Sequence, residues 1–416
     1  MKTNRAYSTI STLLCGVGIL LLGACQSKTT SIQKAPLNGY WRGELSLSDT
    51  INRPLPFQFI VEGPIGQQQM TVQNGREAIV LNPFYEKNDS IEVVWPVFES
   101  GFVFQSSDSL MSGYWYDRSR GDNYRIPFEA RYGVQYRFKQ TDRPSERLAG
   151  TWRTHFGEKA PNALGLFKEQ GGLLSGSFAT ETGDYRFLEG VIQGNQFKLS
   201  TIDGAHAFLF DGTINGDSLW GTFYSGDHYS EHFYALRDDE FELIKADELT
   251  YLKEGYSTVD FAFPDLNGDN ILLSDDRFNN KAMVIQLFGS WCPNCMDESI
   301  YLTELYEKES ARGLEIVGLG FERHKEFDKA SNAIIKMRQD LLIPYTLLVA
   351  GPANKKAAAE KLPMLNHVLS FPTAIVLNRK HEVIGIHTGF YGPGTGNYYE
   401  EFKEEFEEWI ALALRE

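Results

Sequence analysis

The stretch Trp-Cys-Pro-Asn-Cys at residues 291–295 follows an apolar run over residues 283–288 and precedes a segment with helical spacing. Two cysteines separated by two residues at the start of a helix lie within one helical turn of each other. The helix N-terminus offers unpaired N–H groups and a partial positive charge, which favour the thiolate of Cys292. Cys295 is then close enough to attack a mixed disulfide on Cys292. The stretch therefore predicts a strand–turn–helix unit with redox-active cysteines.

Length and composition set the frame for this unit. A chain of 416 residues predicts about two to four domains. Apolar residues make up 42% of the chain and charged residues 23%, which is typical of folded globular proteins and argues against extensive disorder. The net charge of −15 argues against nucleic acid as a partner, because phosphates require basic patches. Nothing in the sequence indicates a cofactor.

The N-terminal residues have the pattern of a secretory signal. Lys2 and Arg5 precede an apolar run over residues 13–24, which is shorter than the ~20 residues of a membrane span. The ending Leu-Gly-Ala-Cys at 22–25 resembles a bacterial lipobox. We therefore expect residues 1–25 to be a lipoprotein signal peptide with Cys25 as the lipidated residue. An ordinary cleaved signal and a signal anchor are the alternatives.

A lipidated Cys25 has two consequences. Attached acyl chains would hold the protein to a membrane, and residues 26–35 would form a polar tether. Gln26 replaces the aspartate that retains some lipoproteins in the inner membrane, so an outer-membrane, periplasm-facing location in the cell envelope is slightly favoured. Of the four cysteines, Cys15 would be removed with the signal, which leaves Cys292 and Cys295 as the one thiol pair.

Residues 36–238 have the pattern of short antiparallel strands separated by glycine-containing turns. Leu-Asn-Gly-Tyr-Trp-Arg at 37–42 recurs as Leu-Ala-Gly-Thr-Trp-Arg at 148–153. A second, looser repeat joins residues 108–115 with 217–224, at nearly the same spacing. We therefore predict a duplicated all-β region with units at 36–140 and 146–238, either as two small barrels or as one sandwich.

The Gly-x-Trp opening of each unit resembles the first strand of lipocalins and avidins, some of which hold a small ligand. The favoured alternative is that these tryptophans are core residues and that the β-region is a spacer or a docking surface. His228 and His232 would share a face of a strand, but no third metal ligand is evident, so no metal is predicted. Residues 239–256 have helical spacing and predict a linker helix.

Strand and helix patterns alternate in residues 257–416, which predicts an α/β domain. The expected strands are 282–288, 314–320, 345–349, 373–378 and 383–388. The expected helices are 294–310, 326–341, 354–362 and 398–414. No helix separates the last two strands, so they should form an antiparallel hairpin. The glycine-rich turn at 391–396 lacks the lysine of a phosphate-binding loop and is interpreted as a capped turn.

Three motifs of this domain resemble the thioredoxin superfamily, most closely its membrane-tethered TlpA/ResA-like thiol–disulfide oxidoreductases. Residues 261–268 resemble the N-terminal hairpin of that family. Residues 287–295, Leu-Phe-Gly-Ser-Trp-Cys-Pro-Asn-Cys, resemble its active-site strand and loop. Residues 370–373, Ser-Phe-Pro-Thr, resemble its cis-proline loop. The resemblance implies a thioredoxin-like fold for residues 257–416.

The resemblance also implies roles for five residues. Cys292 would be the exposed nucleophile, Cys295 the buried resolving thiol and Trp291 a shield against water. Pro372, if cis, would place the preceding backbone beside the cysteines, where it can pair with a substrate strand. Glu298, one turn beyond Cys295, would accept that thiol's proton.

Two positions depart from the family pattern. The family often has proline where this chain has Ile300. The buried acid of thioredoxins, six residues before the first cysteine, is replaced by Gln286, which cannot act as a base. More of the proton chemistry would therefore fall to Glu298.

Three alternatives compete for the cysteines. A zinc site would need two further ligands that are not evident. A peroxiredoxin would need proline and threonine or serine where this chain has Ile285 and Gly289. The third is a lipoprotein whose β-units bind a ligand or partner, with the redox domain secondary. We favour an extracytoplasmic thiol–disulfide oxidoreductase that reduces protein disulfides, with a membrane electron donor and a lipid anchor at Cys25.

Overall fold

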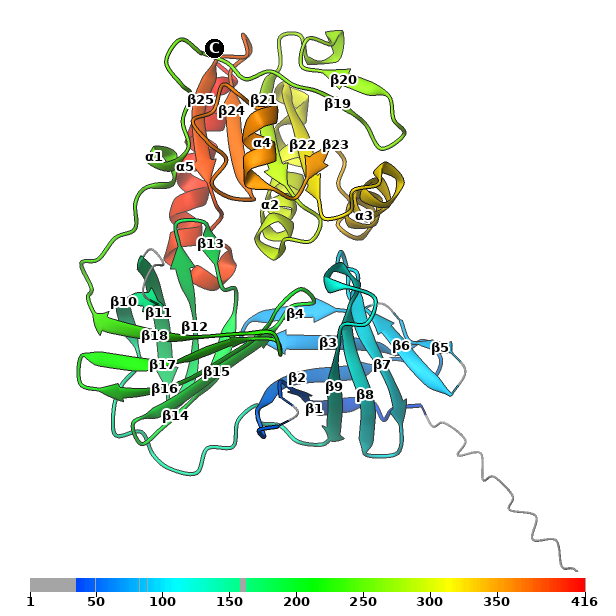
Figure 1. Ribbon diagram of the computed structural model, residues 1–416, viewed down its shortest axis with the longest axis vertical. Coiled ribbons are helices and arrows are strands. Elements are labelled where there is room, and N and C mark those ends of the chain that lie inside the picture. The colour runs from blue at the N-terminus through cyan, green and yellow to red at the C-terminus, as the bar shows by residue number, and fades with distance from the viewer. Residues whose placement is uncertain (1–34, 49, 82, 88, 158–161, 416) are drawn as a thin grey trace, which may run out of the picture. The chain divides into compact units, whose positions relative to one another are not determined.

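The computed structural model describes residues 35–415 except 49, 82, 88 and 158–161 (Figure 1). The predicted signal peptide, Cys25 and nearly all of the tether lie outside the described residues. The described residues belong to one compact unit. Among them, no helix combines the length and the hydropathy that a membrane crossing requires.

The first nine strands form one open antiparallel sheet in the order β4-β3-β2-β1-β9-β8-β7-β6-β5. Alternate residues of β1 are buried, as the period of two predicts for a sheet with one covered face. Buried aromatic rings fill that face, among them Phe57, Phe102 and Phe128. The strands are β1 (Gly39–Ser46), β2 (Pro54–Glu62), β3 (Gln69–Asn74), β4 (Glu77–Val80), β5 (Tyr85–Lys87), β6 (Ser90–Val94), β7 (Ser100–Ser106), β8 (Leu110–Asp117) and β9 (Arg125–Tyr132).

The second nine strands form a closed barrel. Their order is β11-β10-β18-β17-β16-β15-β14-β12-β13, and β11 also pairs with β12, which joins the two sides of the sheet. Its interior is a separate cluster rich in phenylalanine. The strands are β10 (Gly150–Phe156), β11 (Asn162–Gln170), β12 (Leu173–Thr180), β13 (Gly183–Asp184), β14 (Leu188–Gln193), β15 (Gln196–Ile202), β16 (Ala207–Asn215), β17 (Ser218–Ser225) and β18 (Tyr229–Arg237).

The two repeated Gly-x-Trp motifs occupy equivalent places in the two sheets. Trp41 in β1 and Trp152 in β10 are fully buried, and each indole N–H donates to the carbonyl oxygen four residues earlier, at 2.9 and 2.8 Å. The predicted all-β character of this region is confirmed, with one closed barrel and one half-barrel sheet.

The segment between the β-region and the redox domain differs from the prediction of a linker helix over 239–256. Only α1 (Ala246–Leu249) is helical. The backbone of Tyr251 instead bonds to Asn366, through N–H to Oδ1 at 3.0 Å and through its carbonyl at 2.9 Å, and Lys253 N–H donates to the carbonyl of Met364. Pairing with a distant loop thus overrides the helical spacing of the sequence.

The C-terminal domain is a five-stranded sheet in the order β23-β22-β21-β24-β25, with a small hairpin of β19 and β20 before it. β21 is parallel to β22 and antiparallel to β24, and β24 pairs with β25 as the predicted hairpin. All seven residues of β21 are buried, because helices cover the sheet (Figure 1). The elements are β19 (Ala262–Pro264), β20 (Asn270–Leu272), β21 (Ala282–Phe288), α2 (Pro293–Glu309), β22 (Leu314–Glu322), α3 (Phe327–Asp340), β23 (Thr346–Pro352), α4 (Lys355–Lys361), β24 (Thr373–Leu377), β25 (Val383–Thr388) and α5 (Asn397–Ala413).

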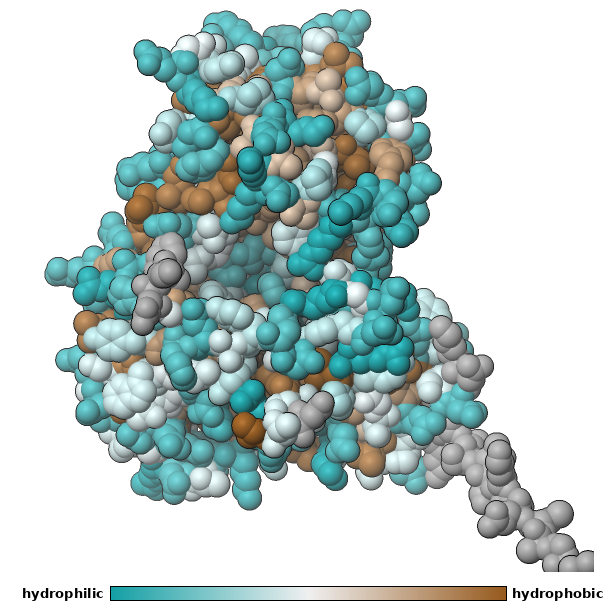
Figure 2. Space-filling model, in the orientation of Figure 1, coloured by the Kyte–Doolittle hydropathy of each residue, from teal (hydrophilic) through white to brown (hydrophobic). Residues whose placement is uncertain are grey.

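Hydrophilic residues cover most of the face seen in Figure 2, and the apolar residues on it lie in scattered patches. The four tryptophans Trp41, Trp95, Trp115 and Trp152 are among the largest fully buried side chains. The aromatic content of the β-region therefore serves mainly as core.

Candidate active site

The two cysteines lie where β21 ends and α2 begins. Cys292 caps α2, Pro293 fills the first helical position, and the N–H of Cys295 donates to Sγ of Cys292 at 3.2 Å. Proline suits this position because its missing N–H would have no partner there. Cys292 and Cys295 form a disulfide with their Cα atoms 5.2 Å apart. The sequence thus folds locally into the strand–turn–helix unit that it predicts.

The predicted site residues around this disulfide come together. The Phe371–Pro372 peptide is cis, and the carbonyl oxygen of Phe371 lies 3.5 Å from Sγ of Cys292. The indole of Trp291 donates to the carbonyl of Phe321 at 2.9 Å and packs edge-on against the Phe371 ring. Cys295 is fully buried, and Cys292, which was expected to be exposed, is only 6% exposed.

Glu298 is buried inside the domain rather than displayed on the surface of α2. Its Oε2 accepts a hydrogen bond from Nε2 of Gln286 at 2.8 Å, and its Oε1 has no hydrogen-bond partner among the described residues. Gln286 also donates to Ser299 Oγ at 3.0 Å. Gln286, at the position of the buried acid of thioredoxins, and Glu298 therefore form one buried polar pair.

Burial raises the pKa of Glu298 to about 8, an effect that the hydrogen bond from Gln286 opposes. A carboxyl group with this pKa holds a proton at neutral pH and can still release it. Glu298 is one helical turn after Cys295. The pair is therefore suited to exchange a proton near the resolving thiol.

A second buried acid was missed by the sequence analysis. Glu322 ends β22, and its carboxylate accepts hydrogen bonds from N–H and Oγ of Ser290, both at 2.8 Å. Burial raises the pKa of Glu322 to about 7, against the opposing effect of the Ser290 hydrogen bonds. The signal in the sequence was a glutamate directly after the apolar run Ile316–Phe321 of β22.

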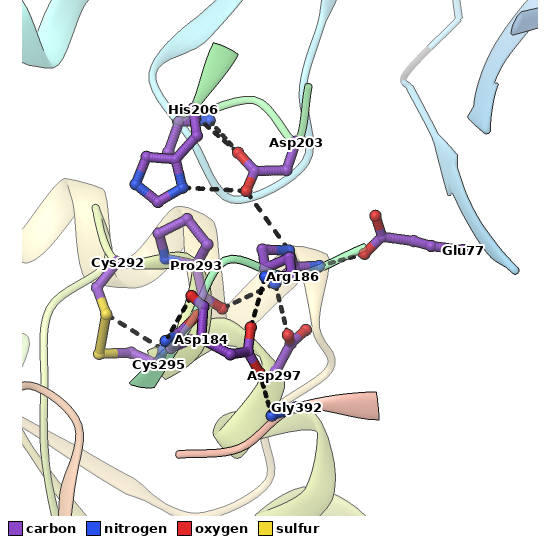
Figure 3. Close-up of polar contacts among 12 residues, drawn as sticks. Glu77, Asp184, Arg186, Asp203, His206, Cys292, Pro293, Cys295, Asp297 and Gly392 are labelled. Atoms are coloured by element: carbon purple, nitrogen blue, oxygen red, sulfur yellow. Dashed lines mark hydrogen bonds and ion pairs between the residues drawn. A yellow bond between two sulfur atoms is a disulfide. The ribbon is translucent and has the colours of Figure 1, made fainter. Parts of the chain in front are cut away.

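A buried arginine from the barrel reaches the redox motif (Figure 3). Arg186, which follows β13, donates through Nη1 to the carbonyl of Pro293 at 3.0 Å and to Asp297 at 2.6 Å. Its Nη2 bonds to Glu77 of the first sheet, and its Nε lies 3.5 Å from Asp203. One guanidinium thus links both β-sheets to the start of α2.

The hairpin between β12 and β13 lies on the same face of the redox domain. Asn294 donates to the carbonyl of Asp184 at 3.3 Å, and Ser370 Oγ donates to the carbonyl of Thr182 at 2.8 Å. The N–H of Gly392 donates to Oδ2 of Asp184 (Figure 3). The cysteine motif and the proline loop are therefore both in contact with the barrel.

The half-barrel contacts the other side of the motif. Arg323 lies 4.7 Å above the Trp291 ring and donates to Ser119 Oγ at 2.6 Å. His324 Nε2 and Glu99 Oε2 are 2.7 Å apart. The half-barrel and the barrel thus both contact residues that neighbour Cys292.

The two histidines considered as metal ligands have separate neighbours. His228 Nδ1 lies 3.1 Å from the hydroxyl of Tyr124, and His232 Nδ1 lies 3.1 Å from Oγ1 of Thr222. Within the described residues, no group of three or more histidine, cysteine or acidic side chains is arranged to hold a metal ion.

The fold and the disulfide at the start of α2 define a thioredoxin-like redox domain. Residues 253–400 match the Redoxin family. The thiol-disulfide oxidoreductase ResA of Bacillus thuringiensis subsp. konkukian is 28% identical over 156 residues, which cover 38% of this chain and 76% of that relative. The thioredoxin-like protein YneN of Bacillus subtilis is 26% identical over 138 residues, covering 33% of this chain and 73% of YneN.

Solved structures are similar to part of the chain. A thiol:disulfide interchange protein of the thioredoxin family from Chlorobium tepidum is 18% identical and has a TM-score of 0.30, with 39% of this chain and 98% of that one covered. A thiol-disulfide oxidoreductase from Bacteroides fragilis is 17% identical, with a TM-score of 0.27 and coverage of 35% and 99%. From the Redoxin match and the sequence relatives, residues 253–400 form a thioredoxin-superfamily, TlpA/ResA-like domain, and the protein is a thioredoxin-like oxidoreductase.

Proposed function

We propose that this protein is an extracytoplasmic thiol–disulfide oxidoreductase that reduces disulfides of protein substrates. The observation that carries the proposal is the Cys292–Cys295 disulfide at the N-terminus of α2, beside the carbonyl of Phe371. Matched relatives named as thiol-disulfide oxidoreductases support the same chemistry.

In the reduced protein, the Cys292 thiolate attacks one sulfur of a substrate disulfide and releases the other as a thiolate. Cys295 then loses its proton and attacks Sγ of Cys292, which frees the second substrate thiol and leaves the Cys292–Cys295 disulfide. Two electrons pass from the protein to the substrate. The ionised form of Glu298, which exchanges with the protonated form at a pH near its pKa of about 8, takes the proton of Cys295. An external dithiol then restores the reduced state.

Two further residues hold the substrate and shield the reaction. Pro372 fixes the loop that places the Phe371 backbone beside Cys292, where it can pair with an extended substrate. Trp291 covers the cysteines on one side, with its indole held by the carbonyl of Phe321. Both assignments follow from the resemblance together with this geometry.

The location belongs to the same proposal. Lys2, Arg5 and the lipobox ending at Cys25 support export and lipidation, with the mature protein anchored in the cell envelope and facing the periplasm. The outer membrane is favoured by Gln26. A membrane protein with a reducing dithiol would supply the electrons.

The test of activity uses the full-length protein, dithiothreitol as the reductant and a disulfide-linked peptide pair as the substrate. Cys292→Ser should lower the rate of peptide reduction to that of dithiothreitol alone. Cys295→Ser should slow turnover, because release of the peptide from Cys292 then depends on attack by dithiothreitol. Reduction by Cys292→Ser at the wild-type rate would overturn the proposal and favour a binding role for the β-units. Cys25→Ser serves as the matched control: it should keep the activity but lose membrane fractionation and the mass of the attached acyl chains.

A further inference from the structure

One end of the barrel holds a cavity of about 510 Å³. Among its lining residues are the last residues of β10 and β17, Phe156 and Ser225, and residues at the start of β16 and β18, Phe208 and Tyr229. Successive strands of an antiparallel barrel run in opposite directions, so these four ends lie at one rim. The cavity is therefore the mouth of the barrel, a common place for a ligand site in this architecture.

Aromatic rings form the wall of this cavity. The ring of Tyr185 lies 5.4 Å, centroid to centroid, from each of Phe156, Phe208 and Phe223. Phe208 and Phe223 are 5.1 Å apart. Such a wall favours an aromatic or other bulky apolar group, which gains both burial and edge-to-face contacts.

The redox domain also supplies part of the wall. Asn294, which lies between the two cysteines, and Leu369, two residues before Phe371, both line the cavity. The hydrogen bonds from Asn294 to Asp184 and from Ser370 to Thr182 hold this wall against the rim. The cavity is therefore shared by the barrel mouth, the cysteine motif and the proline loop.

We propose that this cavity is the substrate-recognition site of the oxidoreductase. It takes an aromatic side chain of a substrate polypeptide, from a residue adjacent in sequence to the substrate cysteine whose disulfide is reduced. The inference rests on the proposed function. A polypeptide is favoured over a free apolar molecule because polar side chains also line the cavity, Arg120, His206 and Glu231, and can bond to a peptide backbone. The chemical step is the disulfide reduction described above, with dithiothreitol as the source of the two electrons.

The experiment compares two disulfide-linked peptides that differ only in the residue beside the cysteine, phenylalanine in one and serine in the other. With the full-length protein, the KM should be lower for the phenylalanine peptide by about tenfold or more, the factor that burial of one aromatic side chain supplies. Ser225→Trp fills the cavity and should raise that KM to the value of the serine peptide. Ser218→Trp, at the opposite end of β17, is the matched control and should leave the preference intact.

A second measurement needs no variant, in case Ser225→Trp fails to fold. N-acetylphenylalaninamide should inhibit reduction of the phenylalanine peptide competitively, and N-acetylserinamide should not. Equal KM values for the two peptides would overturn the inference. If N-acetylphenylalaninamide bound while the two KM values were equal, the cavity would be a site for a free aromatic molecule, which also overturns it.

A small disulfide substrate distinguishes a failure of the recognition site from a failure of the proposed oxidoreductase activity. The wild-type protein should reduce hydroxyethyl disulfide, which has no aromatic group to place in the cavity. Reduction of that compound without a preference between the peptides contradicts the recognition site alone. If the protein accelerates the reduction of none of the three disulfides above the rate with dithiothreitol alone, the proposed function itself is contradicted.

Discussion

The guanidinium of Arg186, in the barrel, donates a hydrogen bond of 3.0 Å to the carbonyl oxygen of Pro293, the residue after Cys292. The arginine side chain is buried, and its positive charge is balanced by Asp297 of α2, Glu77 of the half-barrel and Asp203 of the barrel (Figure 3). A residue outside the redox domain thus touches the motif that carries the reactive cysteines.

Replacing Arg186 by methionine should lower the free energy of unfolding by about 3–5 kcal/mol, because several buried carboxylates lose their partner. Arg186→Lys should lower the free energy of unfolding by less than Arg186→Met does, since lysine keeps the positive charge but cannot make the forked hydrogen bonds of arginine. Urea unfolding of the full-length protein measures both.

Arg131, an exposed arginine 3.8 Å from the carboxylate of Glu129, provides the control. Arg131→Met should change the free energy by less than ~1 kcal/mol, and equal losses in both methionine variants would contradict this assignment.

Glu298 should make the protein less stable as the pH rises. Its pKa is about 8 in the folded protein, above the usual value of 4.5. Between these values the folded protein binds the additional proton, so the free energy of unfolding falls by up to ~1.4 kcal/mol per pH unit from this group. This fall in the free energy of unfolding begins above pH 4.5 and is complete above pH 8.

The measurement compares wild type with Glu298→Gln from pH 5 to pH 8. The variant should gain stability relative to wild type as the pH rises, because glutamine is neutral throughout. Glu304→Gln, at an exposed position of the same helix, controls for the loss of one negative charge. A difference between wild type and Glu298→Gln that stays constant with pH would show that Glu298 is not the group responsible.

The barrel should depend on Trp152. This side chain is fully buried, its indole N–H bonds to the carbonyl of Leu148 at 2.8 Å, and its ring lies 4.3 Å from the guanidinium of Arg237. Trp152→Phe leaves a void and an unsatisfied carbonyl, so we expect a loss of about 2–4 kcal/mol in urea unfolding. Trp220, 47% exposed, is the control, and Trp220→Phe should cost less than ~0.5 kcal/mol.

The sequence predicted those parts of the fold that depend on local patterns. The apolar run of β21, the proline after Cys292 and the hairpin of β24 and β25 are all visible as neighbours in the chain. The repeated tryptophans Trp41 and Trp152 likewise indicated equivalent positions in two β-units. Each of these signals is a short local stretch of sequence, although the two tryptophan motifs lie far apart in the chain.

The remaining features depend on residues far apart in the chain. Arg186 lies 107 residues before Pro293, and nothing near it in the sequence indicates a buried cation. Most of the linker segment is not helical, because its backbone pairs with residues around 365. The helical spacing of the linker sequence does not reveal that distant partner. The carbonyl of Phe371 that lies beside Cys292 likewise comes from a residue 79 positions further along the chain.

The most direct test of the proposed activity is the mass of the Cys295→Ser protein after reaction with a disulfide-linked peptide pair. The reduced variant should gain the mass of one peptide, attached to Cys292, because the resolving thiol that would release it is missing. Dithiothreitol should remove the added mass, and the Cys292→Ser variant should gain none. An unmodified Cys295→Ser protein, or equal modification of both variants, would contradict the assignment of Cys292 as the nucleophile.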